Sequence, residues 1–250
     1  MKLIARPSPN HDERGDAVVD MLVLHYTGMQ AAEAALERLC DPAAKVSAHY
    51  TVDEAGRTYA HVPEARRAWH AGASFWAGVT DVNARSIGIE LVNPGHEFGY
   101  RAFPEAQIAA LVTLCHGILS RHPIPAARVL GHSDVAPARK EDPGELFPWA
   151  MLAKEGIGLW PDWIASDLGP QVLSRYGYDP DAPLDTVITA FQRHFRPEKL
   201  DGQWNGECAG PSNPRGRAKS RINPRVPRAI PTARRSSASC RDRSWRRLSN

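Results

Sequence analysis

Residues 131–144 of the chain read GHSDVAPARKEDPG, and this stretch is the most informative guide to its fold and chemistry. It contains His132, Lys140 and Asp142 in a loop that two prolines interrupt and a Pro-Gly pair closes. Histidine and aspartate both bind zinc. Lys140 would lie where negative charge develops if such a metal activated water against a carbonyl group. The stretch therefore predicts one part of a metal-dependent hydrolytic site.

A second histidine, His25, follows the apolar run at residues 21–24 and precedes Gly28. This pattern predicts a buried strand that ends at a turn. His25, His132 and Asp142 would together supply three protein ligands and leave a fourth position for water, as in catalytic zinc sites. The alternative is that both histidines are ordinary hydrogen-bonded residues and that Asp142 only begins a turn.

A carboxylate, Glu90, stands inside another apolar stretch at residues 86–91. An ionised glutamate on a buried face is costly unless it is paired or functional. Beside an activated water it could accept a proton and pass it to a leaving nitrogen. Alternatively, Glu90 pairs with an arginine in the core, and Lys140 is merely solvated between Arg139 and Glu141.

These three stretches, in this order, resemble the zinc-dependent N-acetylmuramoyl-L-alanine amidases, which are related to a phage lysozyme and to peptidoglycan recognition proteins. The resemblance covers roughly residues 6–160. It implies that Zn²⁺ is the cofactor and that peptidoglycan or a muropeptide is the substrate. The bond cut would be the amide between the lactyl group of N-acetylmuramic acid and L-alanine. The implied site residues are the zinc ligands His25, His132 and Asp142, the general base and acid Glu90, and the oxyanion-stabilising Lys140.

The resemblance leaves an alternative open, because some relatives have lost their zinc ligands and only recognise muropeptides. A non-catalytic peptidoglycan-binding protein is therefore the second reading. It also leaves open whether an enzyme of this kind would prefer anhydro-muropeptides or intact wall.

Residues 1–160 alternate between strand and helix patterns. Residues 47–53 and 58–62 read as a hairpin, and helical spacing marks residues 30–40, 104–122 and 147–155. We expect an α/β fold with a mixed central sheet of about five or six strands flanked by helices, as in the family it resembles. The metal would lie in an open groove at the strand ends.

Two further stretches are expected near that groove. His49 is predicted to be a buried, hydrogen-bonded residue close to the cleft. Trp69 and Trp76 belong to an aromatic loop that either walls the groove or simply anchors a packed segment.

Residues 161–206 have a different character, with helical patterns at 168–178 and 184–195. They resemble a small helical peptidoglycan-binding domain, which would hold the enzyme on the wall polymer or position the glycan. The domain is expected to be incomplete, because no third helical pattern follows Gly202. The alternative is a helical extension that packs on the catalytic domain.

Residues 207–250 are predicted to form a disordered basic tail. Residues 211–250 contain twelve Lys or Arg and one acid, whereas the chain as a whole has a net charge of +3. Few aliphatic residues accompany these charges. A basic tail can bind nucleic acid, but neither a binding fold nor a repeated pattern of interleaved aromatic residues accompanies it, so no nucleic-acid partner is expected. A frameshift after about Gly202 is a second explanation of the abrupt change in composition.

The overall composition is that of a globular protein, with 42% hydrophobic residues. No apolar run reaches the ~18 residues that span a membrane, and the N-terminus lacks the apolar region of a secretory signal. We therefore expect a monomeric, cytoplasmic protein. A periplasmic location is the alternative if the start site is misassigned.

Overall fold

The computed structural model describes residues 2–160 and 169–204; residues 1, 161–168 and 205–250 are not described. The expected basic tail and the proposed frameshift therefore lie outside the described residues. Six strands form one sheet in the order β1-β5-β4-β7-β3-β8. Their bounds are β1 (Leu3–Ala5), β3 (Met21–Tyr26), β4 (Tyr50–Val52), β5 (Thr58–Ala60), β7 (Ser86–Leu91) and β8 (Val129–Gly131). This confirms the expected mixed sheet.

Strands β4, β7, β3 and β8 run parallel to one another, whereas β5 pairs antiparallel with β4 and parallel with β1. The β4–β5 pair is the hairpin that the sequence predicted. Its turn is held by Asp53, whose carboxylate accepts hydrogen bonds from the N–H groups of Ala55 and Arg57. Two short strands, β2 (His11–Glu13) and β6 (Arg66–Ala68), form a separate antiparallel pair.

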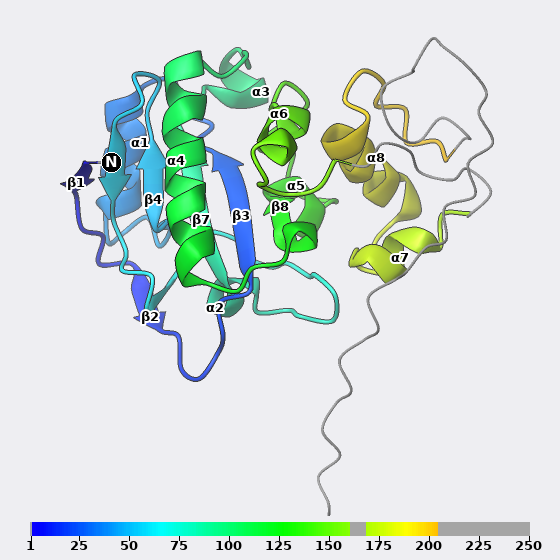
Figure 1. Cartoon of the computed structure of the whole chain (residues 1–250), viewed down its shortest axis with the longest axis horizontal. Coiled ribbons are helices and arrows are strands. Elements are labelled where there is room, and N and C mark those ends of the chain that lie inside the picture. Colours follow the sequence, from blue (N-terminus) through cyan, green and yellow to red (C-terminus); the bar gives the residue numbers. More distant parts are fainter. Residues whose placement is uncertain (1, 161–168, 205–250) are drawn as a thin grey trace, which may run out of the picture. The chain divides into compact units, whose positions relative to one another are not determined.

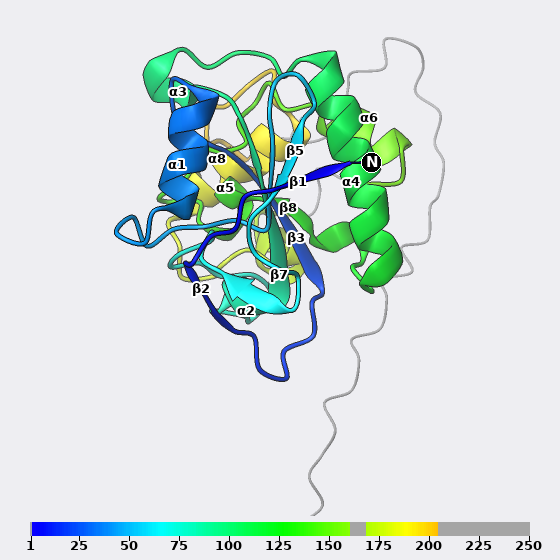
Figure 2. The ribbon, with the colours of Figure 1, turned by 90° about the vertical axis from the view of Figure 1, so that its left-hand side faces the viewer.

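Helices cover both faces of the sheet. Figures 1 and 2 show α1 (Ala32–Cys40) and α4 (Glu105–Arg121) on opposite sides of the strands. The shorter helices are α2 (Val82–Arg85), α3 (Gly95–Phe98), the 3₁₀ turn Ala126–Arg128, α5 (His132–Val135) and α6 (Trp149–Lys154). The helices predicted at 30–40, 104–122 and 147–155 are confirmed as α1, α4 and α6, with slightly shorter bounds.

The alternation of side chains along β3 separates two hydrophobic clusters. Leu22 and Leu24 pack in a cluster with Leu111 and Ile118 of α4. Met21 and Val23 belong to a second cluster on the other face. The period of two also assigns His25 to the second face, so this face carries both apolar packing and the chemistry of the site.

The C-terminal helices α7 (Val172–Tyr176) and α8 (Leu184–Phe195) contribute to that second cluster. Leu173 and Phe191 are buried there with Met21 and Val23. The helix predicted at 184–195 is confirmed as α8. The one predicted at 168–178 is confirmed in shorter form as α7, and residue 168 lies outside the described residues.

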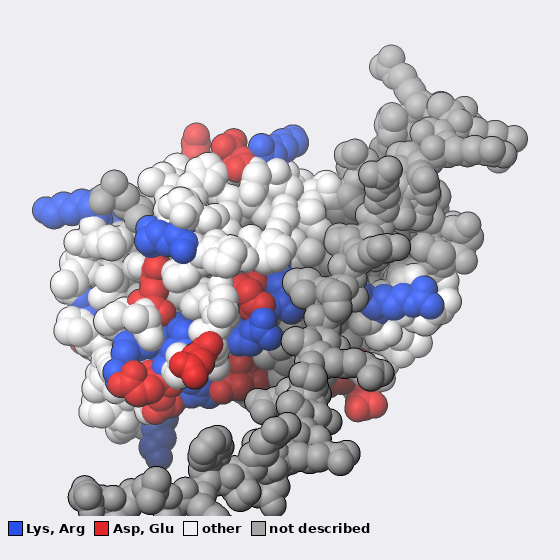
Figure 3. All heavy atoms as spheres, turned by 60° about the horizontal axis from the view of Figure 1, so that its bottom comes forward, with Lys and Arg blue, Asp and Glu red and all other residues white. Residues whose placement is uncertain are grey.

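Charged side chains of both signs lie next to one another on the face shown in Figure 3. Ion pairs such as Arg67 with Asp12 and Asp81 are part of the described structure. Within residues 2–160 and 169–204, no helix is both long enough and apolar enough to cross a membrane.

Candidate metal centre and active site

The candidate site lies at the carboxyl ends of three parallel strands. His25 on β3 is the register partner of Glu90 on β7, and His132 directly follows β8. The carboxyl ends of parallel strands meet at one edge of a sheet, where α/β proteins commonly bind ligands. Residues that are far apart in the sequence are therefore brought together by strand pairing.

His25, His132 and Asp142 form a buried cluster whose ligand atoms could hold one metal ion. The Nδ1 atoms of the two histidines are 3.0 Å apart. Oδ2 of Asp142 is 3.1 Å from Nδ1 of His25 and 3.0 Å from Nδ1 of His132. Ligand atoms of a tetrahedral zinc with bonds of about 2.0–2.2 Å would be about 3.3–3.6 Å apart. The triangle is therefore close to the size that such an ion requires.

A chain of hydrogen bonds determines which nitrogen of His25 carries its proton. The hydroxyl of Ser86 donates to the carbonyl of Val82 at 2.7 Å, so its oxygen can accept from Nε2–H of His70 at 3.1 Å. Nδ1 of His70 is then an acceptor, 3.0 Å from Nε2 of His25. His25 therefore carries its proton on Nε2 and presents the lone pair of Nδ1 to the cluster.

His132 is oriented in the same way by a backbone group. Its Nε2 is 3.0 Å from the carbonyl oxygen of Ala71, which can only accept. The proton of His132 is accordingly on Nε2, and Nδ1 is free to act as a ligand. Both histidines thus present Nδ1 to the same point.

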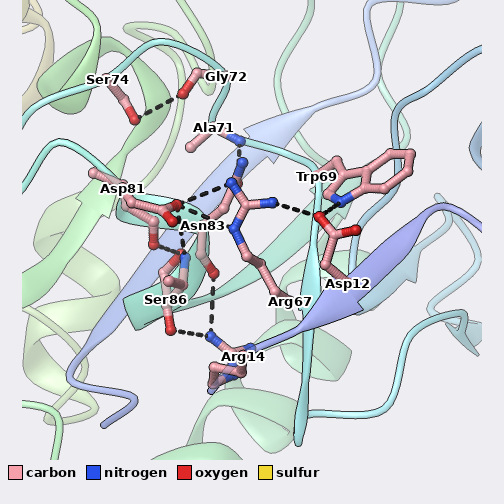
Figure 4. Close-up of polar contacts among 12 residues, drawn as sticks. Asp12, Arg14, Arg67, Trp69, Ala71, Gly72, Ser74, Asp81, Asn83 and Ser86 are labelled. Carbon is pink, nitrogen blue, oxygen red and sulfur yellow. Dashed lines mark hydrogen bonds and ion pairs between the residues drawn. The ribbon is translucent and has the colours of Figure 1, made fainter. Parts of the chain in front are cut away.

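The segment that orients both histidines is itself held by Asn83. Oδ1 of Asn83 accepts hydrogen bonds from the N–H groups of His70 and Ala71 at 3.1 and 2.8 Å. Asn83 and Ala71 are among the residues labelled in Figure 4. Gly88 on β7 is needed for the close packing of this segment, because a Cβ at that position would lie 2.4 Å from Cγ of His70. The sheet and Asn83 therefore hold in place the segment that orients His25 and His132.

Burial and neighbouring charges favour the protonation states that a cation needs. Burial, assisted by His132, lowers the pKa of His25 to about 4, so its imidazole is neutral at pH 7. Burial alone would raise the pKa of Asp142, but His132 and His25 together hold this pKa well below its usual value. A neutral imidazole and an ionised carboxylate are the forms that bind metals.

Glu90 is the second carboxylate of the site. Burial, and then the charge of Asp142, raise the pKa of Glu90 well above its ordinary value. Its Oε2 is buried and has no hydrogen-bond partner among the described residues. Glu90 lines the same cavity as His132, Lys140 and Asp142. A carboxyl group with a raised pKa beside a cavity is suited to taking up and releasing a proton.

The cavity has a volume of about 720 Å³ and extends beyond the cluster of candidate metal ligands. Trp69 lines it, as one reading of the aromatic loop predicted, whereas Trp76 is fully buried in the second hydrophobic cluster. His49 is buried as predicted, and its Nδ1 accepts the N–H of Gly88 at 2.9 Å. Helix α8 also contributes to the lining, which the sequence did not indicate.

Sequence reasoning missed three residues that support the site. His70 and Asn83 carry no signal in the sequence, because their contacts with His25 and Ala71 join separate parts of the chain. Asp134 is the third, and its place two residues after His132 suggests no more than a turn. Its carboxylate in fact accepts from the hydroxyl of Tyr178 at 2.6 Å and lies 2.7 Å from Nδ1 of His194.

Comparison with known proteins identifies the family. A family model described as N-acetylmuramoyl-L-alanine amidase matches residues 15–145. The N-acetylmuramoyl-L-alanine amidase AmiD of Escherichia coli is 40% identical over 221 residues, which is 76% of this chain and 79% of that protein. The 1,6-anhydro-N-acetylmuramyl-L-alanine amidase AmpD of Escherichia coli is 34% identical over 164 residues, 58% of this chain and 87% of AmpD.

Solved structures agree with this result. The structure of Escherichia coli AmiD in complex with anhydro-N-acetylmuramic acid-L-Ala-D-γ-Glu-L-Lys has a TM-score of 0.69 and 38% identity, covering 78% of this chain and 88% of that one. AmpDh3 from Pseudomonas aeruginosa has a TM-score of 0.68 and 34% identity, covering 80% and 91%. With a matching family model over more than half of its length, this chain belongs to the N-acetylmuramoyl-L-alanine amidase family.

Proposed function

We propose that this protein is a zinc-dependent hydrolase of the amide bond between the lactyl group of N-acetylmuramic acid and L-alanine. Its substrate would be peptidoglycan or a muropeptide. Family membership supports the reaction class. AmiD, which is 40% identical, is known in complex with the substrate anhydro-N-acetylmuramic acid-L-Ala-D-γ-Glu-L-Lys. The residues of this chain supply independent support for the metal and for the proton transfers.

The observation that carries the proposal is the shared orientation of His25 and His132. Both have Nε2 placed to donate a proton, to His70 and to the carbonyl of Ala71, so both can offer Nδ1 beside Oδ2 of Asp142. Two imidazoles and one carboxylate make a ligand set typical of catalytic zinc. When bound there, zinc would lower the pKa of a water molecule and polarise the scissile carbonyl.

Glu90 would carry the proton between the attacking water and the leaving group. Its carboxylate accepts a proton from the water, and its raised pKa helps to retain that proton. The protonated carboxyl then donates to the alanine nitrogen as the carbon–nitrogen bond breaks. General acid–base catalysis of this kind contributes roughly 10²–10⁴-fold to the rate.

Lys140 would stabilise the negative charge that develops on the carbonyl oxygen during attack. It lines the cavity together with Glu90 and Asp142. In the sequence it lies eight residues after His132, in the same connecting segment. An ammonium group aimed at a developing oxyanion contributes most in a site that is partly closed to water.

The decisive experiment incubates zinc-loaded protein with N-acetylmuramyl-L-Ala-D-γ-Glu-L-Lys and measures free tripeptide by mass spectrometry. A Glu90→Gln variant, with its zinc content measured in parallel, is the control. Release by the native protein and not by a variant that retains zinc would establish the hydrolysis and the role of Glu90. Zinc and muropeptide binding without release would instead favour the non-catalytic binding protein.

Three further expectations from the sequence stay predictions. They are the monomeric state, the cytoplasmic location, and the assignment of residues 161–206 as an incomplete peptidoglycan-binding domain.

A further inference from the structure

Helix α8 takes part in forming the cavity that holds the candidate catalytic residues. Thr186, Thr189 and Arg193 of this helix line the cavity along with Lys140 and Glu141. A helix from the C-terminal segment therefore lies where a substrate of the catalytic residues would extend. Among the residues of α8 that line the cavity, Arg193 has the side chain best suited to binding a negatively charged ligand.

Arg193 is only 8% exposed. For a buried arginine, few of the N–H groups of its guanidinium donate hydrogen bonds to other described residues. Its nearest acidic partners are Glu145, 3.6 Å from Nε, and Glu141, 4.0 Å from Nη2. Both distances exceed those of ordinary hydrogen bonds. Nε has no hydrogen-bond partner among the described residues. A buried guanidinium with unused donors is costly unless another group supplies acceptors.

The two acidic neighbours are engaged by His96. Nε2 of His96 is 3.1 Å from Oε2 of Glu145, and its Nδ1 is 3.4 Å from Oε2 of Glu141. These acids reduce the cost of burying the positive charge of Arg193, yet they leave its planar fork without a close acceptor. A carboxylate is the acceptor that such a fork binds best, because two parallel hydrogen bonds can form.

The position of Arg193 is fixed by its sequence neighbour. The ring of His194 stacks on Trp149 with the ring centres 3.8 Å apart, and its Nδ1 is 2.7 Å from Oδ2 of Asp134. Asp134 also accepts the N–H of Gly131, at the start of the turn that carries His132. Helix α8 is thus tied to the same turn as the metal cluster, and Arg193 is held at a defined place on the cavity wall.

We propose that Arg193 of helix α8 forms a subsite for a free carboxylate of the stem peptide. This inference rests on the proposed function, because it assumes that the cavity holds a muropeptide. The ligand in the AmiD structure contains a γ-linked glutamate. A γ-linkage leaves the α-carboxylate of that residue free, and this is the group that we assign to Arg193. The C-terminal segment then determines which peptides are accepted, in addition to any affinity for the wall polymer.

The test compares two substrates in the full-length, zinc-loaded protein. One is anhydro-N-acetylmuramyl-L-Ala-D-γ-Glu-L-Lys, and the other carries a carboxamide in place of the α-carboxylate of the glutamate. Each is assayed with the native protein, with Arg193→Gln and with Arg193→Lys. Arg175→Gln, an exposed arginine on α7, is the matched control.

A charge-assisted bidentate contact predicts that Arg193→Gln lowers kcat/KM for the carboxylate substrate about 10–100-fold. The same variant should change kcat/KM for the carboxamide less than about threefold, and Arg193→Lys should recover part of the loss. Arg175→Gln should leave both values unchanged. Equal losses on both substrates would overturn the proposal, because they would show that Arg193 only supports the structure.

Binding measurements separate this proposal from the proposed function. Calorimetric titration of Glu90→Gln, with and without Arg193→Gln, gives dissociation constants for both ligands in the absence of turnover. If the native protein cleaves neither ligand, the amidase function fails, but selective loss of carboxylate binding on removing Arg193 would still support the subsite. If the carboxylate and the carboxamide bind equally well, the subsite is rejected, whatever the activity.

Discussion

Nε2 of His25 lies 3.0 Å from Nδ1 of His70, and both rings are buried. Because His70 is in turn hydrogen-bonded to Ser86, this contact sets the tautomer of His25 and directs its free lone pair to the metal cluster. His70 is therefore a supporting residue whose effect reaches the metal through another side chain.

Replacing His70 by Phe should weaken zinc binding about 10–100-fold, as the loss of an outer partner of a metal ligand typically does. Competition with a fluorescent zinc chelator would measure the change. His70→Gln, which keeps an acceptor, should recover part of the affinity. His116→Phe removes an exposed histidine on α4 and is the matched control. Equal zinc affinity in His70→Phe and His116→Phe would contradict the orienting role.

Removing the metal should destabilise the protein. Ligand binding to the folded state alone stabilises it by about 4 kcal/mol when the free ligand is at 1,000 times its Kd. Thermal unfolding should therefore shift downward when zinc is chelated and recover when zinc is restored. In Asp142→Asn, which loses the charged ligand, added zinc should no longer raise the unfolding temperature. A zinc-dependent shift of native size in this variant would argue against Asp142 as a ligand.

Replacing Lys140 by Met should lower kcat about 10²–10³-fold while changing KM little, because an oxyanion develops only during the reaction. Steady-state kinetics on the muramyl tripeptide would measure both constants. Zinc content should be unchanged, since Lys140 carries no ligand atom of the cluster. A rise in KM at constant kcat would instead indicate that Lys140 binds the substrate in its ground state.

The residues proposed for the site can be picked out from the sequence for a local reason. His25 and Glu90 interrupt apolar strands, while His132, Lys140 and Asp142 share one short loop, so each stands out against its own neighbours. In the structure, the pairing of β3 with β7 places His25 and Glu90 in register.

The support of the site could not be predicted in the same way. His70 contacts His25 across 45 positions of sequence, and Tyr178 contacts Asp134 across 44. Separations of this length match no helix, strand or turn period, so a single sequence does not indicate that these residues are in contact. The place of Arg193 on the cavity wall depends on how α8 packs against the turn, which hydrophobic periodicity alone does not specify. The burial of Trp76 likewise follows from tertiary packing against Tyr176 and Tyr178.

Stability of the metal-free protein should decrease in mild acid, in part through His49. Burial, and then the charge of Arg14, lower the pKa of His49 to about 3, whereas an unfolded histidine has a pKa near 6.5. The unfolded state therefore binds more protons below pH 6.5. The stabilising contribution is complete above that value and is lost as the pH falls toward 3.

At pH 5 the loss through His49 should be about 2 kcal/mol relative to pH 7. Urea unfolding at the two pH values would measure the free energy difference in the native protein and in His49→Gln. The variant should show a smaller pH dependence, whatever its absolute stability. An identical pH dependence in the two proteins would show that His49 does not titrate on unfolding in this range.

The contact between Tyr178 and Asp134 should stabilise the attachment of the C-terminal segment to the metal-binding turn. The hydroxyl of Tyr178 is fully buried and donates at 2.6 Å to a carboxylate that the protein also buries. A hydrogen bond to a charged group contributes about 1.5–3 kcal/mol, so Tyr178→Phe should lower the free energy of unfolding by about that amount. Tyr176→Phe is the matched control, since no hydrogen bond of its hydroxyl is found among the described residues, and it should change stability little.

Because Asp134 keeps its contacts with Gly131 and His194, kcat of Tyr178→Phe should stay within about twofold of native. Equal destabilisation by the two substitutions would mean that the hydroxyl of Tyr178 contributes no more than ring packing does, and that the segment is held by its apolar contacts alone.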